Sequence, residues 1–468
     1  MKKHEDFSTN YFSSWTSWFK KILLCLIAIL VVSQPGLNGA SRGAARSPNS
    51  MVATVHELAT RSAVETLKRG NAVDAAVTAL FTLAVVWPEA GNLGGGTFFL
   101  LRMADGRTAF IDAREVAPKA ATRDMYLTGK PDASTVGHLA IAVPGAVAGM
   151  AMALERFGSM KWKEVIEPAR QLASNGFPVT YKTAIRMANG GDSIKLFPEA
   201  SRIFLRNGEF PKENEVLIQS DLAATLKRLQ DSGPREFYEG KTAELIIQEM
   251  KSHGGLITME DLKDYKPKIR KPITGMYKGY EIITAPPPSS SGITILQLLQ
   301  MAEYFDLKNS GFHSTDHIHL LTEMMKRTFA DRALYSGDPD FTSIPTDELL
   351  SAKHIKEMAE SIRKDRATPS VEVMDPAKIS GNTTQISIVD RFGNMVSITT
   401  TLNTEFGSGV IAPGTGFFLN NEMDDFTSKP GQPNVYKLIQ GEGNAIQPGK
   451  RPASSMAPTI LIKDGHAV

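Results

Sequence analysis

The sequence predicts a mixed α/β (α+β) fold, in which helices and strands both occur. Three features indicate it. Residues Thr383–Val389 and Met395–Leu402 alternate in polarity around a glycine-containing turn, which is typical of a β-hairpin. Residues Thr97–Arg102 and Thr108–Ile111 flank an Asp-Gly turn and predict a second hairpin. Residues Ala72–Val86 are apolar on almost every side, which indicates a buried helix.

Helical spacing of apolar residues recurs along the rest of the chain. Thr258 precedes Met-Glu-Asp as an N-cap residue would, and Pro286–Gly292 predict a rigid loop before another helix. The predicted helices are Met51–Arg69, Ala146–Arg156, Ser220–Leu229, Thr242–Ser252, Ile293–Tyr304 and Thr315–Leu334. Helices therefore surround apolar hairpins, and spacing alone takes the fold class no further than a mixed helix–sheet chain.

The register of the first hairpin can be inferred from its loop. If the loop is symmetric about Phe392, Ile386 faces Ile398 on an apolar side and Thr383 faces Thr401 on a polar side. Directly opposed residues have Cβ atoms about 4.5–5.5 Å apart. Two threonine hydroxyls therefore face each other at the open end of the hairpin, although a threonine in a half-buried strand is ordinarily a packing residue.

Neighbouring stretches shift the balance from packing toward chemistry at Thr383. Upstream, residues 364–382 are polar, contain prolines and show no sustained period, so they are predicted to form an exposed loop that tolerates cutting. Downstream, residues 420–426 and 451–456 are dense in polar groups between apolar segments. These patterns leave both interpretations of Thr383 open.

Composition excludes some classes of function. The chain has 468 residues, of which 42% are apolar and 22% charged, and its formal net charge is +2. These values are ordinary for a soluble globular protein, and the lack of a long basic run argues against nucleic-acid binding. The length suffices for one large domain or two smaller ones.

The N-terminus, residues 1–40, has the pattern of a secretory signal. Lys20-Lys21 precede the apolar run Ile22–Val32, and small residues follow through Ala40. An uncleaved signal-anchor is the alternative, although the run is shorter than the roughly 20 residues that span a bilayer. The single cysteine, Cys25, lies inside this segment, so the mature chain would have no disulfide. We expect a periplasmic or secreted protein, membrane-anchored if the signal is not cleaved.

Several motifs in order make the chain resemble the γ-glutamyltranspeptidase (γ-glutamyltransferase) family of N-terminal-nucleophile hydrolases, from about Pro48 to the last residue. The motifs are Gly70–Ala76, Ala90–Gly96, Asp112–Glu115, Thr383-Thr384, Thr401–Gly407, Asn420–Phe426, Pro430–Tyr436 and Lys450–Pro458. The resemblance implies a four-layer αββα sandwich. It also implies a precursor that cuts its own Asn382–Thr383 bond into a large subunit, residues 41–382, and a small subunit, residues 383–468, which form a heterodimer.

The resemblance implies γ-glutamyl transfer and hydrolysis on glutathione and other γ-glutamyl amides, with water, an amino acid or a dipeptide as acceptor. Thr383 would be the nucleophile, activated by its own α-amine, and Thr401 would hold its hydroxyl. Substrate roles carry over to Arg114, Ser454 and Ser455 for the carboxylate, to Asn403, Glu422 and Asp425 for the α-amine, and to Tyr436 in the loop over the pocket.

Each of these residues has a packing interpretation as well. Arg114 could form a surface ion pair with Glu115 or Asp112, and the acidic residues 422–425 could form a solvated turn. The serine pair 454–455 could belong to a plain loop, Asn403 could end a strand, and Tyr436 could be a packed aromatic residue. Asp424 receives no role from the family motif.

Other candidate sites are weaker. Gly94–Gly96 lack the Gly-Lys-Ser/Thr of a phosphate loop and are predicted to permit close backbone packing. His313 and His317 are four residues apart, but no third ligand is evident, so both are predicted to be helix-surface residues. We therefore expect no metal ion and no cofactor.

The sequence departs from the family at two places. Gln385 stands where many relatives have histidine, which we expect to tune the site. Thr459–Ile462 predict a strand and His466–Val468 the start of its partner, so the final strands are expected to be missing. The family's oxyanion hole, formed by the N–H groups of a later glycine pair, would be missing with them. Their loss would also expose a sheet edge and part of the core.

Two alternatives to glutamyl transfer stay open. One is a related acylase that removes a glutaryl-like group from a β-lactam nucleus, against which Asn403, Glu422 and Asp425 argue because they suit a substrate ammonium group. The other is a non-catalytic homologue that stays uncut and binds amino acids or peptides, which an incomplete C-terminus favours.

Overall fold

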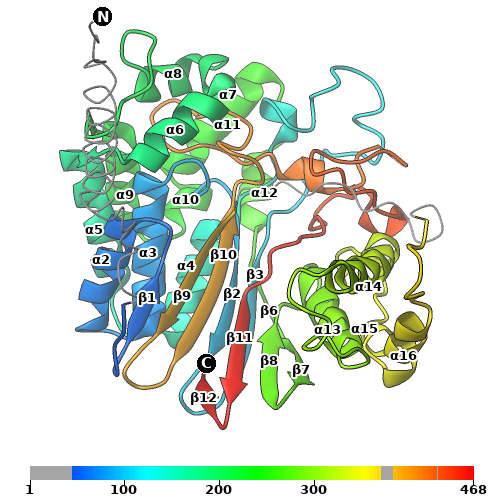
Figure 1. The fold of residues 1–468 in the computed structure, drawn as a ribbon. Coiled ribbons are helices and arrows are strands. Elements are labelled where there is room, and N and C mark those ends of the chain that lie inside the picture. The colour runs from blue at the N-terminus through cyan, green and yellow to red at the C-terminus, as the bar shows by residue number, and fades with distance from the viewer. Residues whose placement is uncertain (1–44, 370–382, 430) are drawn as a thin grey trace, which may run out of the picture. The chain divides into compact units, whose positions relative to one another are not determined.

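The computed structural model describes residues 45–369, 383–429 and 431–468, and residues 49–468 form the unit considered below (Figure 1). The predicted signal segment, Cys25 and Asn382 lie outside the described residues, as does most of the loop predicted before Thr383. Within the described ranges, no helix combines the length and the hydropathy needed to cross a membrane.

A six-stranded antiparallel sheet contains both predicted hairpins. In spatial order its strands are β1 (Met51–Ala53), β9 (Thr384–Val389), β10 (Met395–Thr401), β2 (Gly96–Arg102), β3 (Thr108–Ala113) and β6 (Lys268–Arg270). The predicted register is confirmed, because Ile386 pairs with Ile398. The ladder ends at the pair Thr384–Thr400, so Thr383 stands one residue before β9, at the end where β10 reaches Thr401.

The helix predicted from Met51 to Arg69 is wrong at its beginning. Met51–Ala53 pair with β9 as a strand, and helix α2 (Glu57–Leu67) starts only after the N-cap residue His56. The apolar spacing of these residues fits either state. The partner strand, which lies far away in the sequence, decides between them, and no local pattern contains that information.

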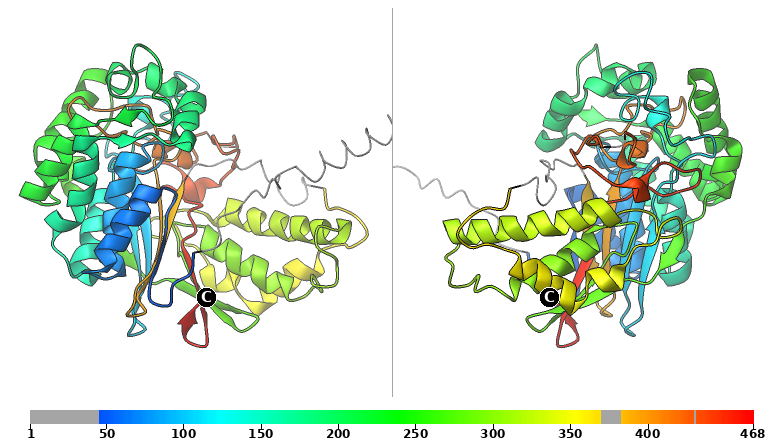
Figure 2. Two further views of the ribbon diagram at one scale, coloured as in Figure 1. Left: turned by 60° about the vertical axis from the view of Figure 1, so that its left-hand side comes forward. Right: turned by 90° about the vertical axis from the view of Figure 1, so that its right-hand side faces the viewer.

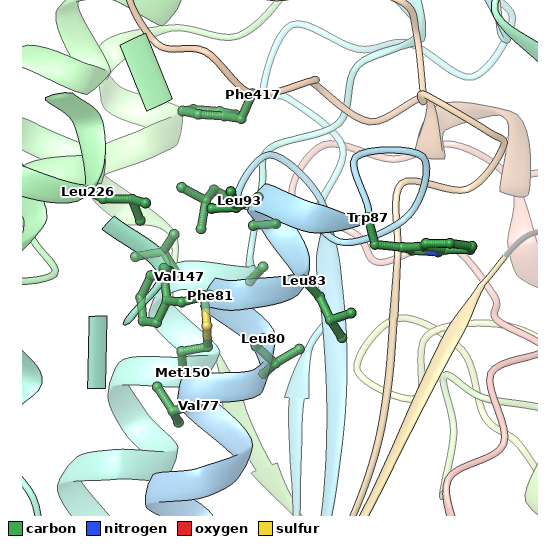
Figure 3. Packing of buried hydrophobic residues seen from close by; sticks show 14 of the residues in the cluster. Val77, Leu80, Phe81, Leu83, Trp87, Leu93, Val147, Met150, Leu226 and Phe417 are labelled. Carbon is green, nitrogen blue, oxygen red and sulfur yellow. The ribbon is translucent and has the colours of Figure 1, made fainter. Parts of the chain in front are cut away.

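Strands β2 and β3 are buried on both faces, which explains the run Thr-Phe-Phe-Leu-Leu in β2. Phe99 and Leu101 pack into a large core with the fully buried helix α3 (Ala72–Val86), part of which is drawn in Figure 3. Phe98 and Leu100 point the other way, into a core shared with the second sheet. The six-stranded sheet is therefore an inner layer with apolar contacts on both sides.

The second sheet is also antiparallel, in the order β12 (His466–Ala467), β11 (Thr459–Lys463), β8 (Tyr280–Thr284) and β7 (Ile273–Tyr277). Helices α13 (Ser291–Ala302), α14 (Thr315–Tyr335) and α16 (Ala352–Glu360) cover its outer side (Figure 1, Figure 2). The layers are therefore helix, sheet, sheet and helix, as the resemblance implies. β12 forms one edge, and an open, mainly apolar groove of about 600 Å³ lies between β11 and strands β9 and β10.

The helices predicted from Ala146, Ser220, Thr242, Ile293 and Thr315 are confirmed to within three residues at each end. Thr258 caps its helix with a capping box, as predicted. The remaining elements are α4 (Ala146–Phe157), α5 (Trp162–Asn175), α6 (Tyr181–Gly190), α7 (Asp192–Lys195), α8 (Pro198–Phe204), α9 (Ser220–Ser232), α10 (Glu236–Glu239), α11 (Lys241–His253), α12 (Met259–Asp264), α15 (Thr346–Leu349), η1 (His138–Ala140), η3 (Glu422–Asp425), η4 (Glu442–Asn444), β4 (Phe177–Pro178) and β5 (Val216–Leu217).

Candidate active site

An open cavity of about 680 Å³ brings the predicted site residues together from distant parts of the sequence. It lies at the end of the six-stranded sheet where β9 begins and where β10 and β3 end. The predicted residues that line it are Thr383, Thr401, Arg114, Asn403, Glu422, Asp425, Tyr436, Ser454 and Ser455. Arg332, Leu438 and Met456 complete the lining.

Thr401 has a fixed hydroxyl at the end of its strand. The residue is buried, and its Oγ1 accepts a hydrogen bond from the Asn403 N–H at 2.9 Å. Asn403 has a φ of +78°, a left-handed conformation that asparagine tolerates, so the chain turns sharply out of β10. Thr383, in contrast, is exposed within the cavity. The two hydroxyl residues thus lie at the same end of neighbouring strands, one free to meet a ligand and one held by the backbone.

Gly95 allows a close approach of the loop before β2 to the end of β10. A Cβ atom at Gly95 would lie 2.2 Å from the Thr401 carbonyl oxygen, which leaves no room for a side chain. Asn92 uses that approach: its Nδ2 donates to the same carbonyl at 2.7 Å, and its Oδ1 accepts the Gly95 N–H at 2.8 Å. The prediction that Gly94–Gly96 permit close packing is confirmed.

Arg114 is the centre of a buried ion cluster. It follows β3, and only 1% of its surface is exposed, so the interpretation as a surface ion pair is wrong. Its guanidinium group donates to Glu422, to Asp425 and, at 2.9 Å, to the carbonyl of Ala453. The acidic residues of η3 are likewise buried, so the interpretation as a solvated turn is also wrong.

The cluster holds more carboxyl groups than guanidinium groups. Burial raises the pKa of Glu422 well above its ordinary value, although Arg114 opposes the shift, and burial raises the pKa of the adjacent Glu115 to about 7. Burial alone would lower the pKa of Arg114, but the carboxylates around it raise that pKa. In the described part of the chain, both carboxylate oxygens of Glu115 and Glu422 Oε2 are buried without a partner that meets ordinary hydrogen-bond geometry. A proton shared between the two carboxyl groups would satisfy both, in agreement with their raised pKa values.

Ser454 and Ser455 lie on a segment that is fixed against the loop Pro286–Gly292. Ser454 is buried, and its N–H donates to the Pro288 carbonyl at 3.0 Å. The Ser455 hydroxyl accepts a hydrogen bond from Nη2 of Arg332 at 3.0 Å. The serine pair therefore lies in an irregular segment, as the loop interpretation has it, but that segment is held in place and forms a wall of the cavity.

Arg332 is a cavity residue that sequence reasoning missed. Burial lowers its pKa to about 10, so the side chain still carries a positive charge at neutral pH. It lies on α14, in a stretch outside every motif that carries the resemblance, and only the packing of the second sheet's helices brings it to the cavity. The site therefore has two cations, Arg114 and Arg332, on different layers of the fold.

Tyr436 joins the loop after η3 to the end of β10. Its hydroxyl donates to the Asn403 carbonyl, and burial raises its pKa. Asp424 anchors the same loop, because its Oδ2 accepts the Val435 N–H at 2.8 Å and its Oδ1 accepts the Ser134 hydroxyl at 2.8 Å. Burial raises the pKa of Asp424 to about 6. The residue without a family role thus holds the loop from which Tyr436 and Leu438 line the cavity.

Gln385 lies on the polar face of the hairpin and does not line the cavity. Its Nε2 donates to the Ser397 hydroxyl at 2.8 Å, and its Oε1 accepts the Thr399 hydroxyl at 2.7 Å. It therefore orders the polar side chains beside the site. The expectation that this substitution tunes the site stays a prediction.

Comparison with known proteins agrees with this geometry. The family model described as gamma-glutamyltranspeptidase matches residues 59–468. The glutathione hydrolase proenzyme of Escherichia coli strain K12 is 47% identical over 430 residues, which cover 90% of this chain and 74% of that protein.

Solved structures share the fold. The crystal structure of cephalosporin acylase from Bacillus halodurans has a TM-score of 0.78 at 28% identity and covers 91% of this chain and 78% of its own. That of Helicobacter pylori gamma-glutamyltranspeptidase has a TM-score of 0.69 at 38% identity and covers 70% of this chain and 96% of its own. Two antiparallel sheets between helical layers, with a threonine at the start of a central strand, define an N-terminal-nucleophile hydrolase. Within that class, the chain belongs to the γ-glutamyltranspeptidase family.

Proposed function

We propose that this protein transfers and hydrolyses the γ-glutamyl groups of glutathione and other γ-glutamyl amides through an acyl-enzyme on Thr383. The observation that carries the proposal is the shared cavity, in which Thr383 and Thr401 lie beside both basic and acidic side chains. A γ-glutamyl donor presents the matching groups: an amide to be attacked, a carboxylate and an ammonium group. The E. coli relative is named a glutathione hydrolase proenzyme, which agrees with this substrate and with a processed precursor.

The chemistry begins with release of the nucleophile. The Thr383 hydroxyl attacks the Asn382 carbonyl carbon, the Asn382–Thr383 amide becomes an ester, and water hydrolyses that ester. Thr383 is then a free N-terminus whose α-amine has an unperturbed pKa of about 7.7–8.0, so part of it is neutral near pH 7. The large and small subunits of the cut precursor stay together as a heterodimer.

Acyl transfer then follows in two steps. Thr383 Oγ1 attacks the γ-carbonyl carbon of the donor, its proton passes to the α-amine, and the leaving amine takes a proton as the C–N bond breaks. A γ-glutamyl ester of Thr383 remains. Water releases glutamate from it, or the amine of an amino acid or dipeptide forms a new γ-glutamyl amide. Thr401 positions the Thr383 hydroxyl throughout.

Donor binding exchanges ion pairs in the cluster around Arg114. Without a donor, the guanidinium group is paired with Glu422 and Asp425. The donor's carboxylate then pairs with Arg114 and accepts hydrogen bonds from Ser454 and Ser455. Its ammonium group pairs with the two acidic side chains and donates to Asn403. The net charge of the cluster is unchanged by this exchange, so neither charged group of the donor is buried without a partner.

Self-cleavage and turnover test the proposal separately. After incubation of the purified full chain, intact-mass measurement and N-terminal sequencing should find a piece that begins at Thr383. A γ-glutamyl anilide should then release its amine, faster when a dipeptide acceptor is added. A chain that stays uncut, binds glutamate and turns over no donor would instead identify a non-catalytic homologue.

The acylase alternative is supported by the likeness to cephalosporin acylase. The two η3 carboxyl groups in the cavity, Glu422 and Asp425, weigh against it, because a glutaryl group has no ammonium to pair with them. Parallel assays with glutaryl and γ-glutamyl anilides at equal concentration separate the two. Hydrolysis of the glutaryl compound alone would reverse the assignment.

Export is part of the proposal. Residues 1–40 direct the chain to the periplasm or the medium, and the protein stays on the membrane if they are not removed. Cell fractionation followed by N-terminal sequencing of the large subunit checks this. Recovery of an intact N-terminus in the cytoplasmic fraction would contradict it.

Tyr436→Phe should weaken donor binding. The ring is kept, but the hydrogen bond to the Asn403 carbonyl is lost. A typical net value of about 0.5–1.5 kcal/mol predicts a rise in donor KM of roughly 2- to 13-fold, with kcat nearly unchanged. Steady-state kinetics measure both, and Tyr304→Phe, at an exposed tyrosine, is the matched control. Equal KM values for the variant and the wild-type enzyme would show that the loop contact has no role in binding.

Glutamate binding should strengthen as the pH rises through about 7. Burial raises the pKa of Glu115 to about 7, so the carboxyl pair holds a proton below that pH and gains negative charge above it. The additional charge attracts the ammonium group of the ligand. The competitive inhibition constant of glutamate, measured from pH 6 to pH 8, should fall in the wild-type enzyme. In Glu115→Gln this fall should be much smaller, and an unchanged slope would exclude the pair as its cause.

A further inference from the structure

We propose that His138, Glu249 and His253 form a binding site for a divalent transition-metal ion of the zinc class. Among the described residues, these three form the group whose ligand atoms could hold a metal, all within 4.8 Å of one another. The site is separate from the active-site cavity, since none of the three residues lines that cavity. The expectation of no metal ion rested on His313 and His317, which lie elsewhere.

The chain assembles the three ligands from two elements. Glu249 and His253 are four residues apart on α11, so they lie on the same face of that helix. His138 begins η1, more than a hundred residues earlier, and its Nε2 lies 2.8 Å from Glu249 Oε1. This spacing hides the site from sequence reasoning, which could detect only the pair on α11.

The distances suit a small metal ion. Glu249 Oε1 lies 2.8 Å from His138 Nε2 and 3.1 Å from His253 Nδ1. Zinc bonds of about 2.0–2.2 Å in a tetrahedral arrangement place neighbouring ligand atoms about 3.4 Å apart, so both Glu249 separations need to lengthen by a few tenths of an ångström. The two histidine ligand atoms lie within 4.8 Å of each other and their rings are stacked, so a side-chain rotation at the exposed His253 must bring them together around the ion. Two imidazole nitrogens and one carboxylate oxygen are a ligand set that zinc uses in proteins.

The three ligands differ in how far they are buried. The side chains of His138 and Glu249 are 10% and 13% exposed, whereas that of His253 is 53% exposed. The inner pair fixes the geometry, and the outer histidine provides an entry path and leaves room for a water ligand. Without a metal, His138 Nε2 and Glu249 Oε1 are hydrogen-bonded to each other, and His253 Nδ1 is hydrogen-bonded to the Glu249 carbonyl oxygen at 3.2 Å.

Metal binding would also stabilise a segment that supports the active-site loop. Residues 132–138 lead to His138. Within them, the Ser134 hydroxyl donates to Asp424, and the Thr135 carbonyl accepts from Asn421 Nδ2 at 2.7 Å. Asp424 in turn holds the loop of Tyr436 through Val435. A metal ion that joins His138 to α11 would therefore limit the motion of residues 132–138.

The proposal is tested by measuring zinc binding to the full-length protein. The protein is purified without a polyhistidine tag and stripped of metal with a chelator. Isothermal titration calorimetry should show one zinc ion per chain, and added zinc should raise the Tm by a few degrees. Glu249→Gln and His253→Asn should each weaken binding at least about tenfold and abolish the Tm shift.

His354→Gln is the matched control. His354 also lies 2.7 Å from a carboxylate, that of Asp331, and the cluster of three ligands does not include it. Its loss should leave zinc affinity unchanged. If Glu249→Gln disturbs folding, His253→Asn still decides the question, because that side chain is largely exposed. Absence of stoichiometric zinc binding to the wild-type protein, or equal affinity in all variants, would overturn the site.

Discussion

Thr383→Ala should leave a single uncut chain without transferase or hydrolase activity. The alanine has no hydroxyl to attack the Asn382 carbonyl, and no other described side chain stands at the start of β9 facing the cavity. Removal of a catalytic nucleophile typically lowers kcat by several powers of ten, on the order of 10⁶. Denaturing gel electrophoresis after incubation shows the processing, and a γ-glutamyl anilide assay shows the activity.

Thr383→Ser is the control for this prediction, because it keeps the hydroxyl and removes only a methyl group. It should still cut itself, although at a different rate, and should retain measurable turnover. If Thr383→Ala were cut at the same bond, a different group or an external protease would be responsible. The assignment of Thr383 would then have to be abandoned for the processing step.

Arg114→Gln should both destabilise the fold and raise the donor KM strongly. The guanidinium group is buried between Glu422 and Asp425, with Glu115 nearby, and its removal leaves carboxyl groups without their cation. Breaking a buried pair in this way costs roughly 3–5 kcal/mol. Urea unfolding of the variant measures the stability, and donor kinetics measure the binding.

A double variant makes this prediction sharper. Arg114→Gln combined with Glu422→Gln removes a carboxylate together with the cation, so it should recover part of the lost stability but none of the donor affinity. Arg114→Lys keeps the charge without the two-pronged geometry and should be intermediate in both. A stability of Arg114→Gln equal to the wild-type value would show that the cluster is neutralised by protons rather than by Arg114.

The sequence was most informative where function and local pattern coincide. The hairpin around Phe392 was predicted with the correct register because alternation and turn residues are local properties. The family motifs contain all of the predicted catalytic and substrate-binding residues, and these line one cavity. The sequence could not reveal that Arg114 is already paired with Glu422 and Asp425, because the three residues are far apart in the chain.

The residues missed from the sequence are those placed by tertiary packing. Arg332 reaches the cavity from a helix of the outer layer, and Met51–Ala53 form a strand only because β9 offers an edge to pair with. Neither fact leaves a local signal. Asp424 shows an intermediate case: its motif was evident, but its function as an anchor depends on Ser134, which lies far away in the sequence.

The strand order has a consequence for the two pieces of a cut precursor. The small piece supplies β9 and β10, which lie between β1 and β2 of the large piece, and β11, which pairs with β8. Both sheets therefore contain strands from both pieces, and cutting one peptide bond leaves the hydrogen bonds between the strands intact. Refolding after denaturation, however, has a different kinetic order in the cut and the uncut protein. The uncut chain refolds in a first-order process, whereas separated pieces must find each other, so their recovery after denaturation should increase with protein concentration.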